Sequence, residues 1–380
     1  MPVYLDHNAT TPLDPRVREA MLPYLGEICG NPASVHRFGR ATRMAVDQAR
    51  EQVAALVGAA SGQVVFTGCG TEANNLALLG AAARLPPGPV AVSRIEHPSV
   101  LEPARRLAAA GRELLWLEVD AAGRVRPESL DAALARGARL VSVMLANNET
   151  GVIQDVAALA ARARAAGAVV HTDAVQAAGK IAVDFRALGV HLLTLSAHKL
   201  HGPQGVGALV RDRAVELEPQ LVGGGQEGGL RSGTLNVAGI VGFGAAAALA
   251  AEELETRTAR MRTLRERLER GLAALPGVAL IAAEAERLPN TVMAAVRGVE
   301  AETLLMALDR AGYAVSSGSA CHTGKTEPSH VLTAMGVPAG LALGSIRVSL
   351  GKDSTEADVD GFLAALGAAL QSLTSGAVGA

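Results

Sequence analysis

The sequence predicts an α/β fold in which a mostly parallel sheet is covered by helices on both faces and is followed by a smaller α+β domain. Two observations predict it. Short apolar runs alternate with helix-length amphipathic segments as far as about residue 250, and a long charged helical segment, residues 251–275, follows without a proline. Such alternation is typical of βαβ units, whose strands lie parallel in one sheet. With 380 residues, 49% of them hydrophobic, the chain is long enough for two domains with substantial cores.

The elements expected before residue 250 follow this alternation in order. The expected strands are the apolar runs at residues 63–68, 89–94, 140–148, 168–174, 191–197 and 207–212. The expected helices begin near Glu72 and span residues 100–111 and 156–167. Each run is short and bounded by glycine or polar residues, which favours a buried strand.

The pattern changes after residue 250. The charged segment 251–275 is expected to bridge into the second domain. The strands expected there lie at residues 290–296, 313–319 and 344–351, and the helices at 301–311 and near 355–373. This smaller set of strands and helices predicts an α+β domain.

Composition and charge exclude several classes of function. The net charge is −2 and aromatic residues make up 2% of the chain, which does not favour direct nucleic-acid binding. No basic leader precedes an apolar run, and no stretch offers the roughly 20 apolar residues that a bilayer requires, so no membrane partner is expected. The three cysteines, Cys29, Cys69 and Cys321, show no CxxC spacing and argue against a disulfide framework or a closed zinc site. We therefore expect a soluble cytoplasmic protein.

Unusual residues follow the expected strands, where open α/β sheets bind their ligands. The stretch "FTGCGTEANN", residues 66–75, combines a strand, a glycine turn and a helix start, which can bind an anion but is also common as a plain turn. Asp173 directly follows an apolar strand, with Gln176 three residues on. A carboxylate at that place needs a partner, because burying it unpaired is expensive.

Lys199 follows another apolar run directly, although lysine is a poor residue to bury. Arginine is the usual cation of this chain, which has only four lysines, so a lysine here indicates a need for a deprotonatable amine; the plain alternative is a surface lysine beside a turn. An imine-forming lysine, an aspartate for a pyridinium nitrogen and an anion site together describe a pyridoxal phosphate site. His97 could stack on such a ring, although alone it would more often be a cap or core histidine.

Ten motifs in order then carry a resemblance. They are "YLDHNATTPLDP", "GNPASVHRFGR", "VVFTGCGTEANN", "EHPSV", "NNETGV", "TDAVQAAGK", "SAHKLHGPQGVGAL", "GGGQEGGLRSGTLN", "SSGSAC" and "GSIRVSLG". From residue 3 to about 351 the chain resembles the pyridoxal-phosphate-dependent cysteine desulfurases of the class V aminotransferase family, in the branch similar to the housekeeping iron–sulfur and nitrogenase-associated desulfurases. The resemblance implies a fold-type-I transferase homodimer. Its large cofactor domain would span residues 15–250, and its small domain residues 1–14 and 251–380.

The resemblance also implies roles for individual cofactor-binding residues. Lys199 matches the lysine that binds the cofactor covalently, Asp173 the partner of the pyridine nitrogen, and Gln176 the donor to the phenolic oxygen. His97 matches the catalytic histidine that stacks on the ring. The phosphate-binding positions are Gly70, Thr71, Ser196, His198 and, from the second subunit, Thr234.

The same resemblance implies how substrate and sulfur are handled. Asn148 and Arg347 match the residues that hold the substrate carboxylate, and Cys321 matches the thiol that takes the sulfur as a persulfide. The implied reaction converts L-cysteine to L-alanine, with sulfur passed to an acceptor such as an iron–sulfur scaffold or a tRNA-thiolating enzyme. Two departures bear on partner choice. His7 stands in "HNATT" where tyrosine or asparagine is familiar, and "CHTGKTEPSH" is unusually polar.

Two other functions compete with this one. A pyridoxal phosphate aminotransferase or β-lyase would use the same site without Cys321. A metal or iron–sulfur scaffold would use Cys321, His322 and His330, although their spacing matches no closed site.

Overall fold

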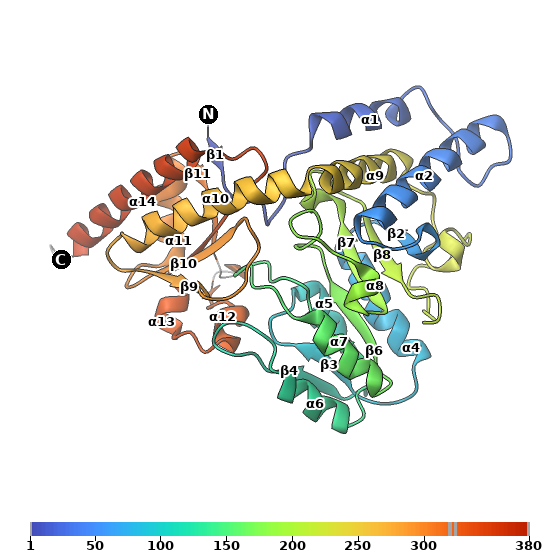
Figure 1. Cartoon of the computed structure of the whole chain (residues 1–380), viewed down its shortest axis with the longest axis horizontal. Helices are drawn as coiled ribbons and strands as arrows, with labels where there is room; N and C mark the ends of the chain where they lie inside the picture. The colour runs from blue at the N-terminus through green and yellow to red at the C-terminus, as the bar shows by residue number, and fades with distance from the viewer. Residues whose placement is uncertain (1, 318–320, 323–324, 378–380) are drawn as a thin grey trace.

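The computed structural model describes residues 2–317, 321–322 and 325–377, of which 321–322, 325–326 and 374–377 are described by their backbone alone. Figure 1 shows two groups of strands with their helices, joined by one long helix. Both the apolar cores and the candidate site follow from how these two groups are built.

A seven-stranded sheet forms the larger group. Its strands, in spatial order, are β2 (Val64–Thr67), β8 (Gly207–Arg211), β7 (Leu192–Ser196), β6 (Val169–Asp173), β5 (Leu140–Ser142), β3 (Val90–Ser93) and β4 (Leu114–Leu117). Strand β8 is antiparallel to both of its neighbours, β2 and β7. The pairs β7–β6, β6–β5, β5–β3 and β3–β4 are parallel. The predicted mostly parallel sheet is confirmed. Strand β4 was missed by the sequence reasoning, because as an edge strand it is only half buried.

Helices cover both faces of this sheet. The helices of the chain are α1 (Pro15–Leu25), α2 (Arg37–Leu56), α3 (Gly70–Asn75), α4 (Ala81–Arg84), α5 (Pro98–Ala109), α6 (Pro127–Ala135), α7 (Val156–Ala165), α8 (Phe185–Leu188), α9 (Val237–Glu252), α10 (Leu254–Ala273), α11 (Ala301–Arg310), α12 (His330–Ala334), α13 (Ala339–Ala342) and α14 (Glu356–Ala377). One buried cluster packs α2, α7 and α9 against one face of the sheet. A second packs α3 and α5 against the other face.

A smaller antiparallel sheet forms the second group. Its strand order is β12 (Ser316–Ser317), β15 (Ser345–Ser349), β10 (Thr291–Val296) and β9 (Val278–Ile281). Its core includes Leu5 of the N-terminal segment, because β1 (Val3–Tyr4) pairs with β11 (Tyr313–Ala314). The N-terminal segment therefore belongs to the same group as β11 and α14.

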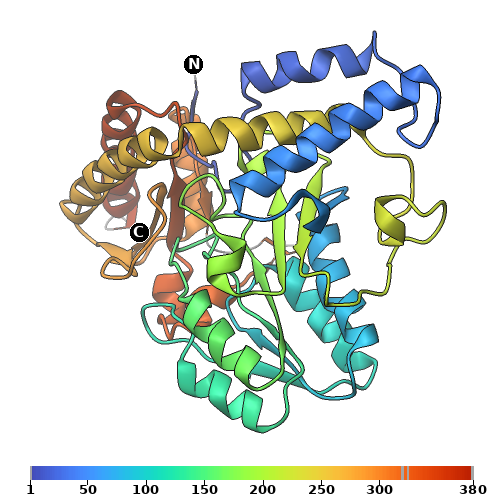
Figure 2. The ribbon, with the colours of Figure 1, turned by 45° about the vertical axis from the view of Figure 1, so that its right-hand side comes forward.

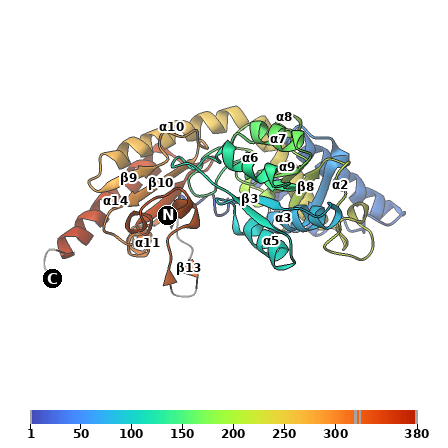
Figure 3. The same ribbon diagram turned by 90° about the horizontal axis from the view of Figure 1, so that it is seen from below.

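Two connections matter for the site. Helix α10 runs from the large sheet to the small one (Figure 2). The backbone of β13 (Cys321–His322) pairs with β14 (Lys325–Thr326), and this hairpin projects from the body in Figure 3.

Within the described part of the chain no single helix is long and apolar enough to cross a membrane; by length and composition alone, only the pair α9 and α10, bent by 72°, passes that test.

Candidate active site

The carboxyl ends of β2, β3, β5, β6 and β7 open onto one cavity of about 300 Å³. Its walls include nine of the residues that the sequence singled out. These are Gly70, Thr71, His97, Asn148, Asp173, Gln176, Ser196, His198 and Lys199. Parallel strands end at the same edge of a sheet, which is why residues from distant parts of the chain meet here.

Lys199 lies at the end of a single 3₁₀ turn, Ala197–Lys199, that directly follows β7. Its Nζ donates to the backbone carbonyls of Asn8 and Ala9, at 2.5 Å each. The pKa of Lys199 is lowered to about 8, mainly by burial and also by Arg347, while Asp6 and Asp173 oppose this. The amine therefore loses its proton just above neutral pH, which suits a nucleophile or base.

Asp173, at the end of β6, is 5% exposed, and both of its carboxylate oxygens accept a hydrogen bond. Its Oδ1 accepts from the Val175 N–H at 2.9 Å, and its Oδ2 accepts from Asn74 Nδ2 at 2.8 Å. The partner that the sequence reasoning required is thus Asn74, on α3. No sequence argument had singled out Asn74, although a buried polar residue on the inner face of a helix was the available signal.

The side chain of Asn74 also connects Asp173 to His97 through hydrogen bonds with Ser99. Asn74 Nδ2 also donates to Ser99 Oγ at 2.8 Å, and Ser99 Oγ lies 2.7 Å from His97 Nδ1. The Ser99 N–H donates to this Nδ1 at 3.1 Å, so His97 caps α5 and carries its neutral-state proton on Nε2. Desolvation lowers the pKa of His97; Asp173 opposes this, and Lys199 and His330 add to it. Ser99 is the second residue that the sequence reasoning missed.

The start of α3 forms one end of the cavity. A Cβ at Gly70 would approach Ser196 Cβ and Val175 Cγ2 to 3.2 Å, so glycine lets the helix start pack against the end of β7. Among the described residues, no hydrogen-bond partner reaches the buried Ser196 Oγ. Free N–H groups at a helix start and an unpartnered hydroxyl are a donor set that suits a phosphate group. His198 Nδ1 lies 3.1 Å from Thr10 Oγ1, and burial lowers the pKa of His198 to about 4.

Arg347 lies on β15 of the smaller sheet and lines a neighbouring cavity of about 760 Å³, together with His97, Asn148 and His330. Its Nη1 donates to the Asn148 carbonyl at 3.0 Å, and its Nη2 to Asp6 Oδ1 at 2.6 Å. Its buried Nε has no partner within the described residues. Arg347 therefore contacts Asn148, which lines the cavity of Lys199, and its Nε–H group remains available to donate a hydrogen bond.

Three of the twelve predicted site residues are not among those that line this cavity, namely Arg347, Thr234 and Cys321. Thr234 is exposed in the segment between β8 and α9, away from the cavity lining. The side chain of Cys321 lies outside the described residues, as does that of His322; only their strand backbone is described. Among the side chains that are described, no cluster of three His, Cys, Asp or Glu residues could hold a metal ion.

Comparisons with known proteins agree with this geometry. The family described as aminotransferase class-V matches residues 3–362. "Cysteine desulfurase 2" of Trichormus variabilis is 45% identical, over 95% of this chain and 91% of that protein. "Cysteine desulfurase IscS" of Anaeromyxobacter sp. is 47% identical, over 95% of this chain and 90% of that protein. The solved NifS-like protein from Rickettsia africae superposes with a TM-score of 0.90 at 35% identity, over 98% of this chain and all of that one (100%).

Proposed function

The chain belongs to the class-V aminotransferase family, and from that premise we infer that it is a pyridoxal-phosphate-dependent cysteine desulfurase. It acts on L-cysteine and passes the sulfur to acceptor proteins. The observation that carries this is the cavity around Lys199, which gathers nine expected residues from five strand ends. Relatives named cysteine desulfurases cover nearly the whole chain at 44–47% identity.

The cavity fits the cofactor. The unpartnered Ser196 hydroxyl beside the start of α3 suits a phosphate, and the Asp173 carboxylate suits a pyridinium nitrogen. When bound, pyridoxal phosphate supplies an electron sink that makes the Cα proton of the substrate acidic. We propose that Lys199 holds the cofactor covalently, that Gln176 donates to its phenolic oxygen and that His97 stacks on its ring. The phosphate would be held by Gly70, Thr71, Ser196, His198 and, from a second subunit, Thr234.

The protein's own residues then perform the proton and sulfur steps. Lys199, once displaced by the substrate amine, takes the Cα proton and returns it to the product. Asn148 and Arg347 would hold the substrate carboxylate and so orient the substrate in the cavity. The Cys321 thiolate forms a bond to the substrate sulfur as the C–S bond breaks; the bonding electrons stay on the substrate Cβ, which takes up the proton that the Cys321 thiol has lost. Alanine leaves, and Cys321 carries a persulfide.

We further propose a homodimer. Several large apolar side chains are exposed on α1, on α2, between these helices and after β8, among them Leu25 (67%), Val35 (82%), Met44 (73%) and Val222 (80%). Figures 1 and 2 show α1 and α2 on the large-sheet side of the molecule. A second copy of the chain would cover them, because monomers rarely leave such a set open to water. Thr234 follows Val222 closely in the chain and would reach the partner's phosphate.

The domain limits and the cellular setting complete the proposal. Residues 15–250 form the cofactor domain, and residues 1–14 with 251–380 form the small domain that carries Cys321. The cytoplasm would keep the thiol reduced. The sulfur would go to an iron–sulfur scaffold or a tRNA-thiolating enzyme, for iron–sulfur cluster assembly or tRNA thiolation.

The test compares two cysteine variants. Cys321→Ser should bind cofactor normally but yield no alanine without an added thiol, because a hydroxyl provides no comparable anion near neutral pH. Cys29→Ser, a matched change at an exposed cysteine, should behave as wild type. Mass spectrometry after limiting L-cysteine should find added sulfur on Cys321 alone. Full alanine production by Cys321→Ser would instead support a β-lyase.

A further inference from the structure

Lys180 is a buried lysine for which the reaction so far has no use. It lies four residues after Gln176, at the end of the "TDAVQAAGK" stretch, and is 5% exposed. Its Nζ donates to two oxygens of Gln176, the backbone carbonyl at 2.9 Å and the side-chain Oε1 at 3.2 Å. Burial lowers the pKa of Lys180 to about 7, and Lys199 and Arg347 add to this.

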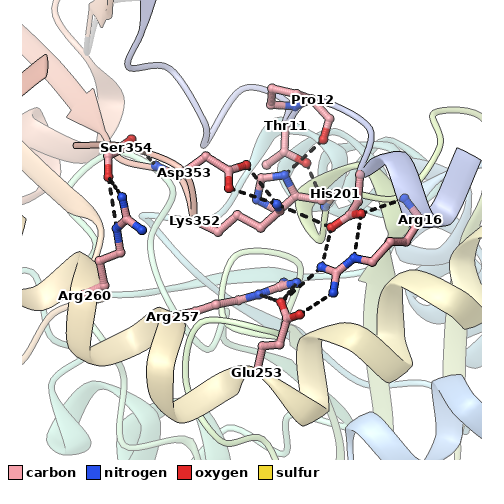
Figure 4. A network of polar contacts seen from close by, with 12 residues as sticks. Thr11, Pro12, Arg16, His201, Glu253, Arg257, Arg260, Lys352, Asp353 and Ser354 are labelled. Carbon is pink, nitrogen blue, oxygen red and sulfur yellow. Dashed lines mark hydrogen bonds and ion pairs between the residues drawn. The ribbon is translucent and has the colours of Figure 1, made fainter.

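Unlike Arg257 and Lys352 nearby, Lys180 has no carboxylate partner among the described residues. A small cavity of about 20 Å³ behind Lys199 is bordered by Lys180, Arg257, Lys352 and two histidines, His7 and His201. Figure 4 shows the polar network around this place, in which Arg257 pairs with Glu253, and Lys352 with Asp14 and Asp353. No carboxylate of the described chain pairs with Lys180. An unpaired buried amine is costly, so its hydrogen bonds must do something that an apolar residue could not.

Those hydrogen bonds define the orientation of an amide. A glutamine side chain can turn over and exchange its oxygen and nitrogen with little change of shape. Lys180, when protonated, can only donate, so it selects Oε1. On the other side Gln176 Nε2 donates to the Asn8 carbonyl at 3.0 Å, and a carbonyl can only accept. Both neighbours therefore demand the same orientation, and one N–H of the amide is left over at the wall of the Lys199 cavity.

We propose that Lys180 is a positioning residue whose amine holds the Gln176 amide with its N–H group toward the cofactor's phenolic oxygen. This rests on the proposed cofactor role of Gln176. With the amide reversed, an oxygen lone pair would face the anionic ring oxygen and repel it. When Lys180 is deprotonated, its two N–H groups can still donate to the two Gln176 oxygens, and the Asn8 carbonyl, which can only accept, still demands the same amide orientation.

A double-mutant cycle on the cofactor-loaded enzyme tests this. Lys180→Met keeps the length of the side chain and removes the donor, and Gln176→Met removes the amide on which it acts. Each single variant should weaken cofactor binding about 5-fold, the effect of one lost hydrogen bond. Each single variant should also raise, by about half a unit, the pH at which the visible absorption of the bound cofactor changes, because the anionic oxygen loses its donor.

The coupling between the two changes decides the outcome. The double variant should be no worse than either single variant, since Lys180 acts only through Gln176. Lys180→Arg, which also only donates, should restore the wild-type absorption. Additive effects, an unchanged absorption in Lys180→Met, or failure of Lys180→Met to fold would each overturn the proposal and make Lys180 a structural residue. Failure of the wild-type protein to bind the cofactor would instead refute the proposed function.

Discussion

Arg347 offers the sharpest test of substrate binding. Its guanidinium lies between the Asn148 carbonyl and the Asp6 carboxylate, and its buried Nε has no partner in the described chain. A substrate carboxylate could pair with two parallel N–H groups of arginine, which the single ammonium of lysine cannot match. Losing one charge-assisted hydrogen bond costs about 2 kcal/mol, so Arg347→Lys should raise the KM for L-cysteine about 30-fold.

Replacing Arg347 with lysine also separates the loss of hydrogen-bond geometry from a loss of positive charge. Arg347 lowers the pKa of Lys199, and lysine preserves that positive charge, so the amine should keep its pH behaviour. Since Arg347 is not part of the Lys199 cavity lining, the absorption of the bound cofactor should not change.

Asp6→Asn is the matched control for this experiment. It removes the carboxylate that competes with the substrate for Arg347, so the KM should fall or stay the same. Steady-state kinetics and cofactor absorption spectra measure both variants. Loss of the cofactor spectrum in Arg347→Lys, or a KM that rises equally in Asp6→Asn, would show that the pair is structural.

Four further predictions concern the cofactor site, the dimer and stability. Lys199→Ala should abolish alanine formation and leave the cofactor removable by dialysis, because the amine that holds it is gone. Asp173→Ala should lower kcat at least 100-fold, with weaker cofactor binding; near-normal exchange of the substrate Cα proton would contradict its pairing with the ring nitrogen. Thr234→Ala should lower cofactor occupancy and make it depend on protein concentration, whereas an active monomer on dilution would argue against a shared site. The unfolding temperature of the apoprotein should fall as pH drops from about 6.5 to 4, because buried neutral histidines must then take up protons on unfolding. The histidines concerned have pKa values lowered to between about 3 and 4, and they are His7, His171, His198 and His201. Glu96 and Glu149 act in the opposite direction, since their raised pKa values make stability fall as pH rises toward about 8, but they are fewer; an unfolding temperature that rises on acidification would refute this balance.

The sequence predicts the larger sheet and most of the cavity because both depend on local patterns. Apolar runs mark buried strands, and parallel strands place whatever follows them at one edge, so the sequence alone is enough to bring Lys199 and Asp173 to the same site. Strand β9 was missed together with β4, since neither is fully buried. In both cases the burial pattern that marks a strand in sequence is incomplete.

Contacts between distant segments could not be predicted in this way. Arg347 and Asp6 are 341 positions apart, and they meet because the N-terminal segment pairs with β11 and, at Asp6, with Ser349 at the end of β15. The links from Asp173 through Asn74 to Ser99 depend on which face of α3 meets β6. Periodicity can place a residue on the inner face of a helix, but it does not name the residue opposite.

Glu96 shows how the fold assigns charge among neighbouring carboxyl groups in a way that residue type does not reveal. It precedes His97 and would pass for an ordinary surface glutamate, yet it is fully buried, with Oε1 accepting from Ser93 Oγ and the Met144 N–H at 2.6 Å each. Burial, with a contribution from Asp173, raises the pKa of Glu96 to about 8, so it is mostly neutral at pH 7. Two N–H groups donate to the Asp173 carboxylate, one from Asn74 and one from Val175. A neutral Glu96 adds no negative charge of its own beside Asp173, the residue that we propose as the partner of the pyridine nitrogen.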